Sequence, residues 1–301
     1  MKKVVVTGGA GFIGSHLCEK LAGLPGYAVW SLDNYSSGST DNHVEGVTYL
    51  NGDTRDIDQR IDFTPDLVFH LGEYSRTEQS FADVEKVLQF NQSGTQAVIE
   101  FCRQRGCKLV YAGSSTKFAD AGSGPEQSPY AWTKAANTQL IQLYGKWYGL
   151  SYAIAYFYNA YGPREISSGP YATLIGLFTR HMRDGSELQV VHPGAQVRNF
   201  THVRDIVEGV YLVGEHGQGD GYAVGSEEGY SVLDIARMFG GPIKMLPPRP
   251  GNRMHASLNS EKTQALGWAP QYSVSQYIKQ LRANDWRQQA DAETPLDLTP
   301  Q

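Results

Sequence analysis

Short apolar runs alternate with longer segments of helical periodicity through the first half of the chain. Each run stops at glycine or polar residues, as a buried strand does at the edge of a sheet. Apolar residues recur at helical spacing over 84–105, with an interruption near 91–94, and a further helix is expected over 130–148. The predicted strands are residues 4–6, 28–32, 47–50, 67–72 and 108–113. This alternation predicts an α/β fold with a doubly wound parallel sheet, the Rossmann arrangement.

The first apolar run ends in a glycine-rich turn. Residues 8–14 are Gly-Gly-Ala-Gly-Phe-Ile-Gly, and a helical pattern begins directly after them. Gly8, Gly11 and Gly14 leave no side chain where the turn must be sharp and a dinucleotide pyrophosphate must approach the backbone. Free N–H groups at the helix start can then bind the phosphates. A glycine turn alone is weak evidence, because such turns also occur where nothing binds.

Acidic residues follow the next two predicted strands. Asp33 lies nineteen residues after Gly14, where a carboxylate is expected to accept hydrogen bonds from the adenosine ribose. The same carboxylate would repel a 2′-phosphate, which favours NAD over NADP. Asp33 can instead cap a turn with Asn34. Asp53 can hydrogen-bond the adenine amine or serve only as the N-cap of a short helix, and the sequence does not choose between these roles.

The composition is that of a globular protein. With 301 residues, 41% of them apolar and 19% charged, the chain can bury a large core. The N-terminal apolar run is too short for a signal sequence and no apolar segment reaches a membrane-spanning length, so we expect a cytoplasmic protein. A net charge of −5 without a basic block argues against a nucleic-acid surface. Three cysteines without Cys-x-x-Cys spacing suggest neither a disulfide framework nor a zinc site.

A tyrosine and a lysine open the predicted helix 130–148. Tyr130 and Lys134 are four residues apart, so both side chains lie on one helical face. A lysine ammonium beside a phenol favours the phenolate, and such a pair can act as a general base while the lysine binds a ribose. Ser114, at the end of a strand, can share a substrate hydroxyl with Tyr130. The alternatives are a solvated helix face, and a serine cluster at 114–116 that only caps the next turn.

Further short motifs accompany these residues. They are Thr-Gly-Gly-Ala-Gly-Phe-Ile-Gly at 7–14, Leu-Asp-Asn at 32–34, Gly-Asp at 52–53, His-Leu at 70–71, Tyr130-x-x-x-Lys134, Asn-Ala-Tyr-Gly-Pro at 159–163 and Arg-Asn-Phe-Thr-His-Val-x-Asp at 198–205. Through them the chain resembles an extended short-chain dehydrogenase/reductase of the NAD-dependent sugar epimerase/dehydratase family. The resemblance runs from Lys3 to about Ala283. These motifs are highly specific for the family and much less so for the substrate.

The resemblance implies NAD as the cofactor, a catalytic set and a nucleotide-sugar substrate. It makes Tyr130 the acid/base, Lys134 its partner and nicotinamide-ribose ligand, and Ser114 the catalytic hydroxyl. The expected NAD-binding residues are Gly8, Gly11, Phe12, Ile13, Gly14, Asp33, Asn34, Asp53, Thr54, Leu71 and Lys134. The expected substrate-binding residues are Glu73, Ser115, Thr116, Tyr130, Asn159, Arg198, Arg249 and Ala256. No metal is expected.

Two of these residues have a physical reason of their own. Arg198 and Arg249 fall on the family's diphosphate-binding arginines, and a planar guanidinium binds a nucleoside diphosphate with paired hydrogen bonds. Both lie in the second half, where Pro/Gly-rich loops and short elements such as 187–191 suggest a smaller lobe. The expected division is a dinucleotide-binding domain at 1–163 with a return segment at about 200–226, a substrate-binding lobe at 164–199 and 227–285, and a loosely ordered tail at 286–301.

Several positions depart from the family pattern. Glu73 and Tyr74 replace small residues, Tyr156 replaces an arginine, and Lys117 replaces a valine near the active site. Glu73 can be a second acid/base group or can select the sugar. It can also simply form an ion pair with Arg76 or Lys117, which is the common situation for an acid near basic residues.

The residues after the catalytic hydroxyl bear on the reaction. The family's dehydratases have Asp-Glu there, which supply an acid and a base for eliminating water, whereas this chain has Ser115 and Thr116. We therefore expect an isomerase, a nucleotide-diphosphate-sugar 4-epimerase acting on a UDP-hexose by oxidation at C4, rotation of the 4-keto sugar and re-reduction. A 4,6-dehydratase or 4-ketoreductase of the same family is the alternative. A catalytically silent NAD-binding sensor or scaffold is the alternative of another class, and the intact catalytic set argues against it.

Two finer expectations follow from the family. Ala256 lies seven positions after Arg249, where a bulky residue would exclude an N-acetyl group, so UDP-N-acetylhexosamines are expected substrates as well. The helices at 84–105 and 130–148 are expected to form a homodimer, since their apolar and aromatic content exceeds what one sheet face obviously covers.

Overall fold

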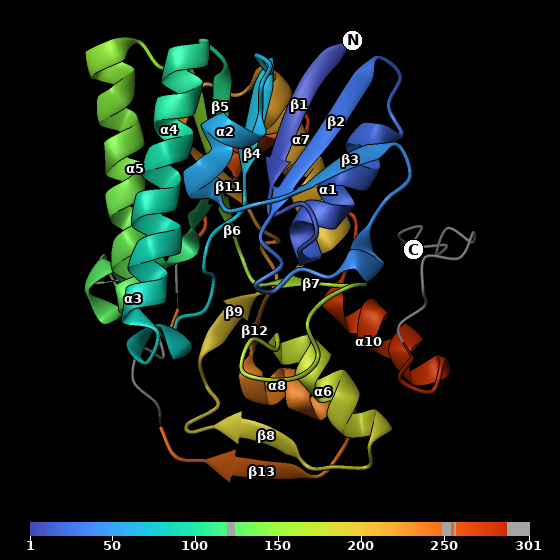
Figure 1. Ribbon diagram of the computed structural model, residues 1–301. Coiled ribbons are helices and arrows are strands. Elements are labelled where there is room, and N and C mark those ends of the chain that lie inside the picture. The colour runs from blue at the N-terminus through green and yellow to red at the C-terminus, as the bar shows by residue number, and fades with distance from the viewer. Residues whose placement is uncertain (119–123, 249–253, 256, 288–301) are drawn as a thin grey trace.

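The computed structural model describes residues 1–118, 124–248, 254–255 and 257–287. Its centre is a seven-stranded sheet in the order β11-β6-β5-β4-β1-β2-β3, and every neighbouring pair in it is parallel (Figure 1). The strands are β1 (Lys2–Thr7), β2 (Tyr27–Asp33), β3 (Val47–Asn51), β4 (Leu67–His70), β5 (Lys108–Ser114), β6 (Tyr152–Phe157) and β11 (Gly219–Val224). The predicted α/β fold with a doubly wound parallel sheet is confirmed.

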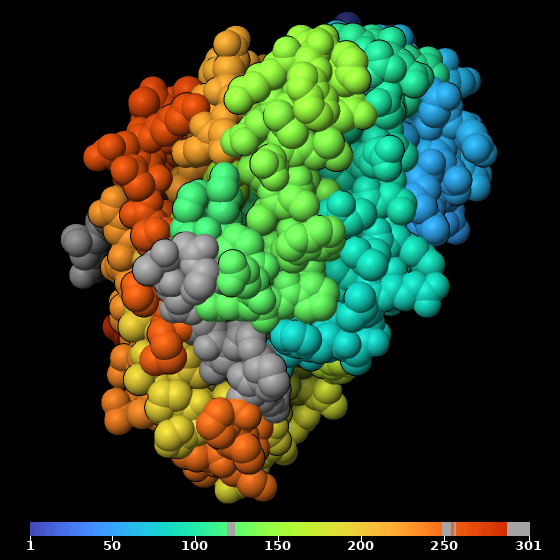
Figure 2. All heavy atoms as spheres, turned by 90° about the vertical axis from the view of Figure 1, so that its left-hand side faces the viewer, coloured from blue at the N-terminus to red at the C-terminus, as the bar shows by residue number. Residues whose placement is uncertain are grey.

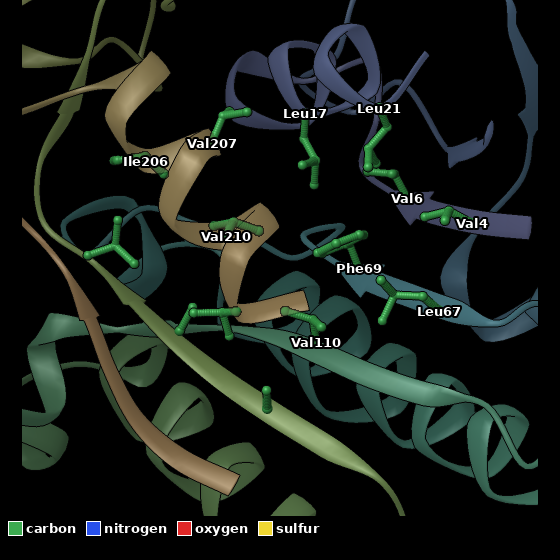
Figure 3. Packing of buried hydrophobic residues seen from close by; sticks show 14 of the residues in the cluster. Val4, Val6, Leu17, Leu21, Leu67, Phe69, Val110, Ile206, Val207 and Val210 are labelled. Carbon is green, nitrogen blue, oxygen red and sulfur yellow. The ribbon is translucent and has the colours of Figure 1, made fainter. Parts of the chain in front are cut away.

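Helices cover both faces of this sheet. One face is covered by α1 (Phe12–Ala22) and α7 (Val203–His216), and Figure 3 shows Leu17 and Val210 of these helices close to strand residues such as Phe69. The other face is covered by α2 (Ile57–Arg60), α4 (Gly94–Arg105) and α5 (Pro129–Tyr148), which bury a second apolar cluster. Because both faces are buried, the central strands contain near-continuous apolar runs, as their sequence predicts.

The segment 84–105 is interrupted where the sequence predicts. It consists of α3 (Val84–Val87), a π-helical turn η4 (Leu88–Ser93) and α4. The buried Asn91 lies in this turn, where its side-chain oxygen accepts from the Tyr74 amide at 2.7 Å and its Nδ2 donates to the Tyr74 carbonyl at 3.1 Å. The turn thereby holds the loop that follows β4 at the carboxyl edge of the sheet.

A smaller lobe lies at the carboxyl ends of the strands, below the sheet in Figure 1. Its apolar cluster combines α6, α8, α10 and β8. The lobe elements are α6 (Leu174–Arg183), β8 (Leu188–Val191), β9 (Val197–Asn199), β12 (Gly229–Ser231), α8 (Val232–Phe239), β13 (Ile243–Leu246) and α10 (Val274–Ala283). The remaining elements are η1 (Thr40–Asn42), η2 (Thr54–Asp56), η3 (Gln79–Phe81), η5 (Ser115–Phe118), η7 (Gly124–Gln127), β7 (Ala160–Tyr161), β10 (Thr201–His202) and α9 (Glu261–Gln264). The domain boundaries expected from the sequence stay a prediction.

Two further features complete the fold. Trp286, expected to begin a loosely ordered tail, instead stacks on Phe239 with ring centroids 5.4 Å apart, because it packs against the apolar cluster of the lobe. Across the described ranges, no helix combines the length and the apolar character needed to cross a membrane.

Candidate active site

A cavity of about 740 Å³ opens between the carboxyl edge of the sheet and the lobe. This is the position where doubly wound sheets bind ligands. The cavity brings together residues from the glycine turn, from the ends of β2, β4 and β5, from α5 and from the lobe. The sequence-predicted site residues that line it are Gly8, Gly11, Phe12, Ile13, Gly14, Asp33, Asn34, Thr54, Leu71, Glu73, Ser114, Ser115, Thr116, Tyr130, Lys134, Asn159 and Arg198. Arg249 and Ala256 lie outside the described residues.

The glycine turn is shaped as a phosphate cradle. Gly8 adopts a φ of 73°, in the left-handed region that favours glycine, and its carbonyl accepts from the Gly11 amide at 3.1 Å. A Cβ added to Gly14 would lie 2.1 Å from the Gly8 carbonyl oxygen, so α1 reaches the turn only because Gly14 has no side chain. The first amides of α1 are therefore close to the cavity, where a helix N-terminus favours anions. These residues fit the pyrophosphate of a dinucleotide.

Asp33 is held at the edge of the cavity by two backbone amides. Its carboxylate accepts from the Ala10 amide at 2.9 Å and from the Tyr35 amide at 2.8 Å. Burial raises the pKa of Asp33 above its usual value, although both amides favour the ionised form. The carboxylate thus braces the glycine turn and also forms the turn with Asn34 that the sequence offers as an alternative. Its contact with a ribose stays a prediction.

Asp53 caps the short helix η2. Its carboxylate accepts from the Arg55 amide at 2.9 Å and forms an ion pair with the Arg55 guanidinium at 2.8 Å. Burial opposes ionisation, but the hydrogen bonds from Arg55 outweigh it and lower the pKa of Asp53. Asp53 is not among the described residues that line the cavity, whereas its neighbours Gly52 and Thr54 are. The structure thus gives Asp53 the N-cap role, and its contact with adenine stays a prediction.

Ser114, Tyr130 and Lys134 meet at one wall of the cavity. Ser114 is the last residue of β5, and its Oγ accepts hydrogen bonds from the Thr116 hydroxyl at 2.9 Å and the Thr116 amide at 3.3 Å. These bonds leave the Ser114 hydroxyl proton available to a ligand. Helix α5 begins at Pro129 because Ser128 accepts from the Ala131 amide at 3.1 Å, so Tyr130 lies in the first turn and the buried Lys134 one turn later.

Glu73 does not form the ion pair that the sequence suggests. The carboxylate pairs with Lys134, and both side chains are buried. Arg76 instead donates to the Tyr171 carbonyl from Nε at 2.7 Å. The expectation of an ion pair with Arg76 or Lys117 was wrong because the Glu73 side chain turns into the protein rather than along the loop. Lys134 was missed as the partner because it is 61 residues away in the chain.

Lys117 and Tyr156, two other departures from the family pattern, share a partner that the sequence did not indicate. Lys117 forms an ion pair with Asp220 at 3.1 Å and donates to the Tyr156 hydroxyl at 3.0 Å. The same hydroxyl donates to Asp220 at 2.6 Å. This cluster ties the residues after β5 to β6 and β11, so Lys117 supports the loop that carries Ser115 and Thr116. Asp220 gives no sequence signal, since it is one acid in a Gly-rich turn.

Asn159, which follows β6, and Arg198, which lies on the lobe strand β9, also line the cavity. Asn159 has a φ of 32° and donates from Nδ2 to the Asn199 carbonyl at 3.2 Å. Arg198 lies on β9, where Nη1 donates to the Val197 carbonyl at 2.9 Å and to the Met254 carbonyl at 3.3 Å. The guanidinium therefore gives the lobe wall a positive charge of the kind that binds a diphosphate.

Comparison with known proteins supports this interpretation of the site. A model of the family described as NAD dependent epimerase/dehydratase matches residues 4–225. A putative UDP-glucose 4-epimerase from Methanocaldococcus jannaschii is 29% identical over 297 residues, covering 92% of this chain and 96% of that protein. A dTDP-D-glucose 4,6-dehydratase from Bos taurus is 28% identical over 340 residues, covering 99% of this chain and 94% of that protein.

A solved structure agrees with the sequence relatives. The UDP-glucose 4-epimerase of Thermus thermophilus, in complex with NAD, superposes with a TM-score of 0.84 at 29% identity, covering 94% of this chain and 98% of that one. The similar proteins thus catalyse different reactions on related nucleotide sugars. The match across most of the chain, the shared fold and the dinucleotide cradle agree, and the chain therefore belongs to the NAD dependent epimerase/dehydratase family, with NAD as its cofactor.

Proposed function

We propose that this protein is a nucleotide-diphosphate-sugar 4-epimerase that acts on UDP-hexoses and UDP-N-acetylhexosamines. The observation that carries the proposal is the meeting of Ser114, Tyr130 and Lys134 in the same cavity as the glycine turn. A hydroxyl, a phenol and an ammonium beside a dinucleotide site are the groups needed to oxidise a sugar alcohol and reduce the ketone again.

In this proposal Tyr130 removes the proton from the C4 hydroxyl. It returns the proton after the 4-keto sugar has rotated in the cavity. The Ser114 hydroxyl donates a hydrogen bond to the C4 oxygen and holds that oxygen near Tyr130, while Lys134 stabilises the ionised phenol. When bound, NAD supplies the oxidation at C4 and the later reduction. Gly8, Gly11 and Gly14 would hold its pyrophosphate.

The UDP part of the proposed substrate would bind at the lobe wall of the cavity. Arg198 supports a diphosphate at the lobe wall, and Arg249, outside the described residues, is its expected partner. Two of the similar epimerases carry UDP-glucose in their names. The proposed acceptance of N-acetyl substrates depends on Ala256, which also lies outside the described residues.

Product analysis tests the reaction. The purified enzyme is incubated with UDP-glucose, UDP-galactose, their N-acetylamino forms and the corresponding dTDP and GDP sugars, and the products are resolved by NMR. Interconversion of the C4 epimers without net NADH formation supports the proposal.

Ala256→Tyr is expected to remove activity on the N-acetyl pair only, because the larger side chain collides with the acetamide. An equal loss on both pairs contradicts the assignment of Ala256.

A 4,6-dehydratase is the second candidate, because a carboxylate, Glu73, lies in the cavity wall. Elimination across C5 and C6 needs a proton acceptor and a donor in addition to Tyr130. The Glu73 carboxylate is already occupied by Lys134 and by neutral donors, which favours the epimerase. Appearance of a 4-keto-6-deoxy sugar in the same NMR experiment would establish the dehydratase instead. Binding of NAD without any turnover would indicate the silent sensor.

A further inference from the structure

Glu73 lies directly behind the proposed catalytic lysine and has no counterpart in the family pattern, which has a small residue there. It follows β4 in the loop that lines the cavity. Its side chain is only 2% exposed and that of Lys134 only 7% exposed. A carboxylate at this depth is strongly disfavoured unless its charge and its lone pairs are satisfied.

Four donors satisfy this carboxylate. Lys134 Nζ pairs with Oε2, while Oε1 accepts from the Thr95 hydroxyl at 2.6 Å, from Asn137 Nδ2 at 2.9 Å and from the Tyr111 hydroxyl at 3.1 Å. These donors come from α4, α5 and β5. An ionised carboxylate can only accept, so this set of donors fits the charged form of Glu73. The ion pair leaves the buried site electrically neutral.

A chain of hydrogen bonds extends from Glu73 to the glycine turn. Since Thr95 donates to Glu73, its oxygen accepts from His70 Nε2 at 2.9 Å, which leaves His70 Nδ1 to accept from the Thr7 hydroxyl at 2.7 Å. The Thr7 oxygen in turn accepts from the Gly72 amide at 3.0 Å. Every donor in this chain points toward the carboxylate. Such a chain is strengthened cooperatively and fixes the position of its end, the Glu73 oxygens.

Lys134 is thereby restricted to one remaining direction. Its ammonium donates to Glu73 and to the Ala112 carbonyl. An ammonium has three N–H donors, so one remains for the cavity, where Tyr130 lies one helical turn earlier. The tyrosine, the lysine and the carboxylate therefore form a row of alternating charge whenever Tyr130 is ionised.

We propose that Glu73 is a positioning residue that keeps Lys134 charged and directed into the cavity, and that its charge limits how strongly Lys134 stabilises ionised Tyr130. This inference rests on the proposed role of Tyr130. Without Glu73, the ammonium would act on Tyr130 uncompensated and Tyr130 would ionise at lower pH. Lys134 would also lose its proton at lower pH, because removing a negative charge favours the less positive form of every neighbour.

The other titratable groups around Glu73 do not interfere with this test. Tyr111 and His70 are buried against it: burial raises the pKa of Tyr111 well above its usual range and lowers the pKa of His70 to about 4. Both therefore stay neutral near neutral pH. Arg76 faces Tyr130 from the same loop and stays charged. Removal of the Glu73 charge therefore acts on Lys134 and Tyr130 rather than on these described neighbours.

The test is the pH profile of kcat/KM for Glu73→Gln, measured with the nucleotide sugar that the wild type converts. Both the acidic and the alkaline limb of the profile are expected to move to lower pH by about one pH unit. Glu73→Asp keeps the charge, so its limbs should stay in place while its kcat falls. Glu45→Gln, which removes an exposed glutamate in the loop before β3, is the matched control and should coincide with the wild type. Loss of rate in Glu73→Gln with both limbs unmoved indicates a merely structural role and overturns the inference.

A second measurement covers the case in which Glu73→Gln does not fold alone. Lys134→Met leaves a buried, unpaired carboxylate and should lower the melting temperature. Adding Glu73→Gln to it removes that charge and should raise the melting temperature above that of Lys134→Met. A double variant that melts at or below the temperature of Lys134→Met overturns the inference. Retention of activity by Tyr130→Phe would contradict the proposed function itself. That result is distinct from the outcomes above, which contradict only the role of Glu73.

Discussion

Tyr130 carries the proton in the proposed reaction, so its hydroxyl is the first atom to test. Tyr130→Phe removes the transferable proton and little volume, and the side chain lies on the cavity wall rather than in an apolar core. We expect turnover to fall by about 10²–10⁴-fold, the usual contribution of a general acid/base group, while NAD still binds. Steady-state kinetics and calorimetric titration with NAD measure the two effects separately. Activity within a few-fold of the wild type would exclude Tyr130 as the base.

Glu165 gives a second prediction at the level of single residues, in the loop after residues 159–163. It is buried, accepts from the Thr173 hydroxyl, and burial raises its pKa from 4.5 to about 8. Below pH 4.5 both the folded and the unfolded chain hold this proton, so its contribution to stability is complete. Between pH 4.5 and 8 the unfolded chain ionises first, and the stability contribution is lost as the pH rises.

Glu165→Gln should therefore flatten the fall of the unfolding free energy between about pH 5 and 8. Urea unfolding at several pH values measures this slope. Glu45→Gln is the control, because that glutamate is exposed in the loop before β3 and its removal should leave the slope as in the wild type. A slope in Glu165→Gln equal to that of the wild type would contradict the assigned titration.

At the level of elements, the sequence predicts what periodicity and turn chemistry encode. The strands of the sheet, the glycine turn and the start of α5 at Ser128 follow from local patterns, and the interruption of 84–105 appears as a π-helical turn. The partners of Glu73 could not be predicted, because they come from three elements that only the fold brings together. Asp220 was missed for the same reason: its partners Lys117 and Tyr156 lie on other segments.

The close contact between α1 and the glycine turn gives a test of the NAD cradle. In Gly14→Ala the added Cβ would lie 2.1 Å from the Gly8 carbonyl oxygen, so helix or turn must move. We expect a loss of about 1–3 kcal/mol in unfolding free energy and weaker NAD binding, measured by urea unfolding and by titration.

Gly23→Ala is the matched control at the other end of α1. Gly23 has a φ of −75°, and an added Cβ would come no nearer than 3.4 Å to the Glu19 carbonyl oxygen. This variant should bind NAD as the wild type does. Normal NAD affinity in Gly14→Ala would show that NAD binding does not depend on the position of the glycine turn.

At the scale of the whole molecule, the cavity is formed by the sheet with its helices on one side and by the smaller lobe on the other. Helix α7 and β11 return the chain from the lobe to the sheet, where α7 packs against α1 and β11 pairs with β6. The proposed catalytic residues belong to the sheet side, and Arg198 belongs to the lobe strand β9. Asn159, which follows β6, donates from Nδ2 to the carbonyl of Asn199 on the lobe strand β9 at 3.2 Å, so the two sides are joined beside the cavity. The residues proposed to bind the substrate from the two sides are therefore held in fixed relation.

One face of the molecule carries large aromatic side chains that are exposed to solvent. Helices α3, α4 and α5 face the viewer in Figure 2, and on α5 the side chains of Trp132, Trp147 and Tyr148 are 52%, 58% and 58% exposed. Large aromatic side chains in contact with water favour burial by about 25 cal/mol per Å² of apolar surface. We propose a homodimer formed through this face, which rests on the family resemblance and on these exposed side chains.

Light scattering at micromolar concentration tests the dimer. The wild type is expected to show twice the monomer mass, and Trp147→Glu is expected to shift it to the monomer, because the charge would have to be buried at the interface. Met245→Glu changes a comparably exposed apolar side chain, 44% exposed, on β13 of the lobe and should leave the dimer intact. Monomeric wild type would remove the proposed dimer altogether. Dissociation by Met245→Glu but not by Trp147→Glu would move the interface from α5 to the lobe.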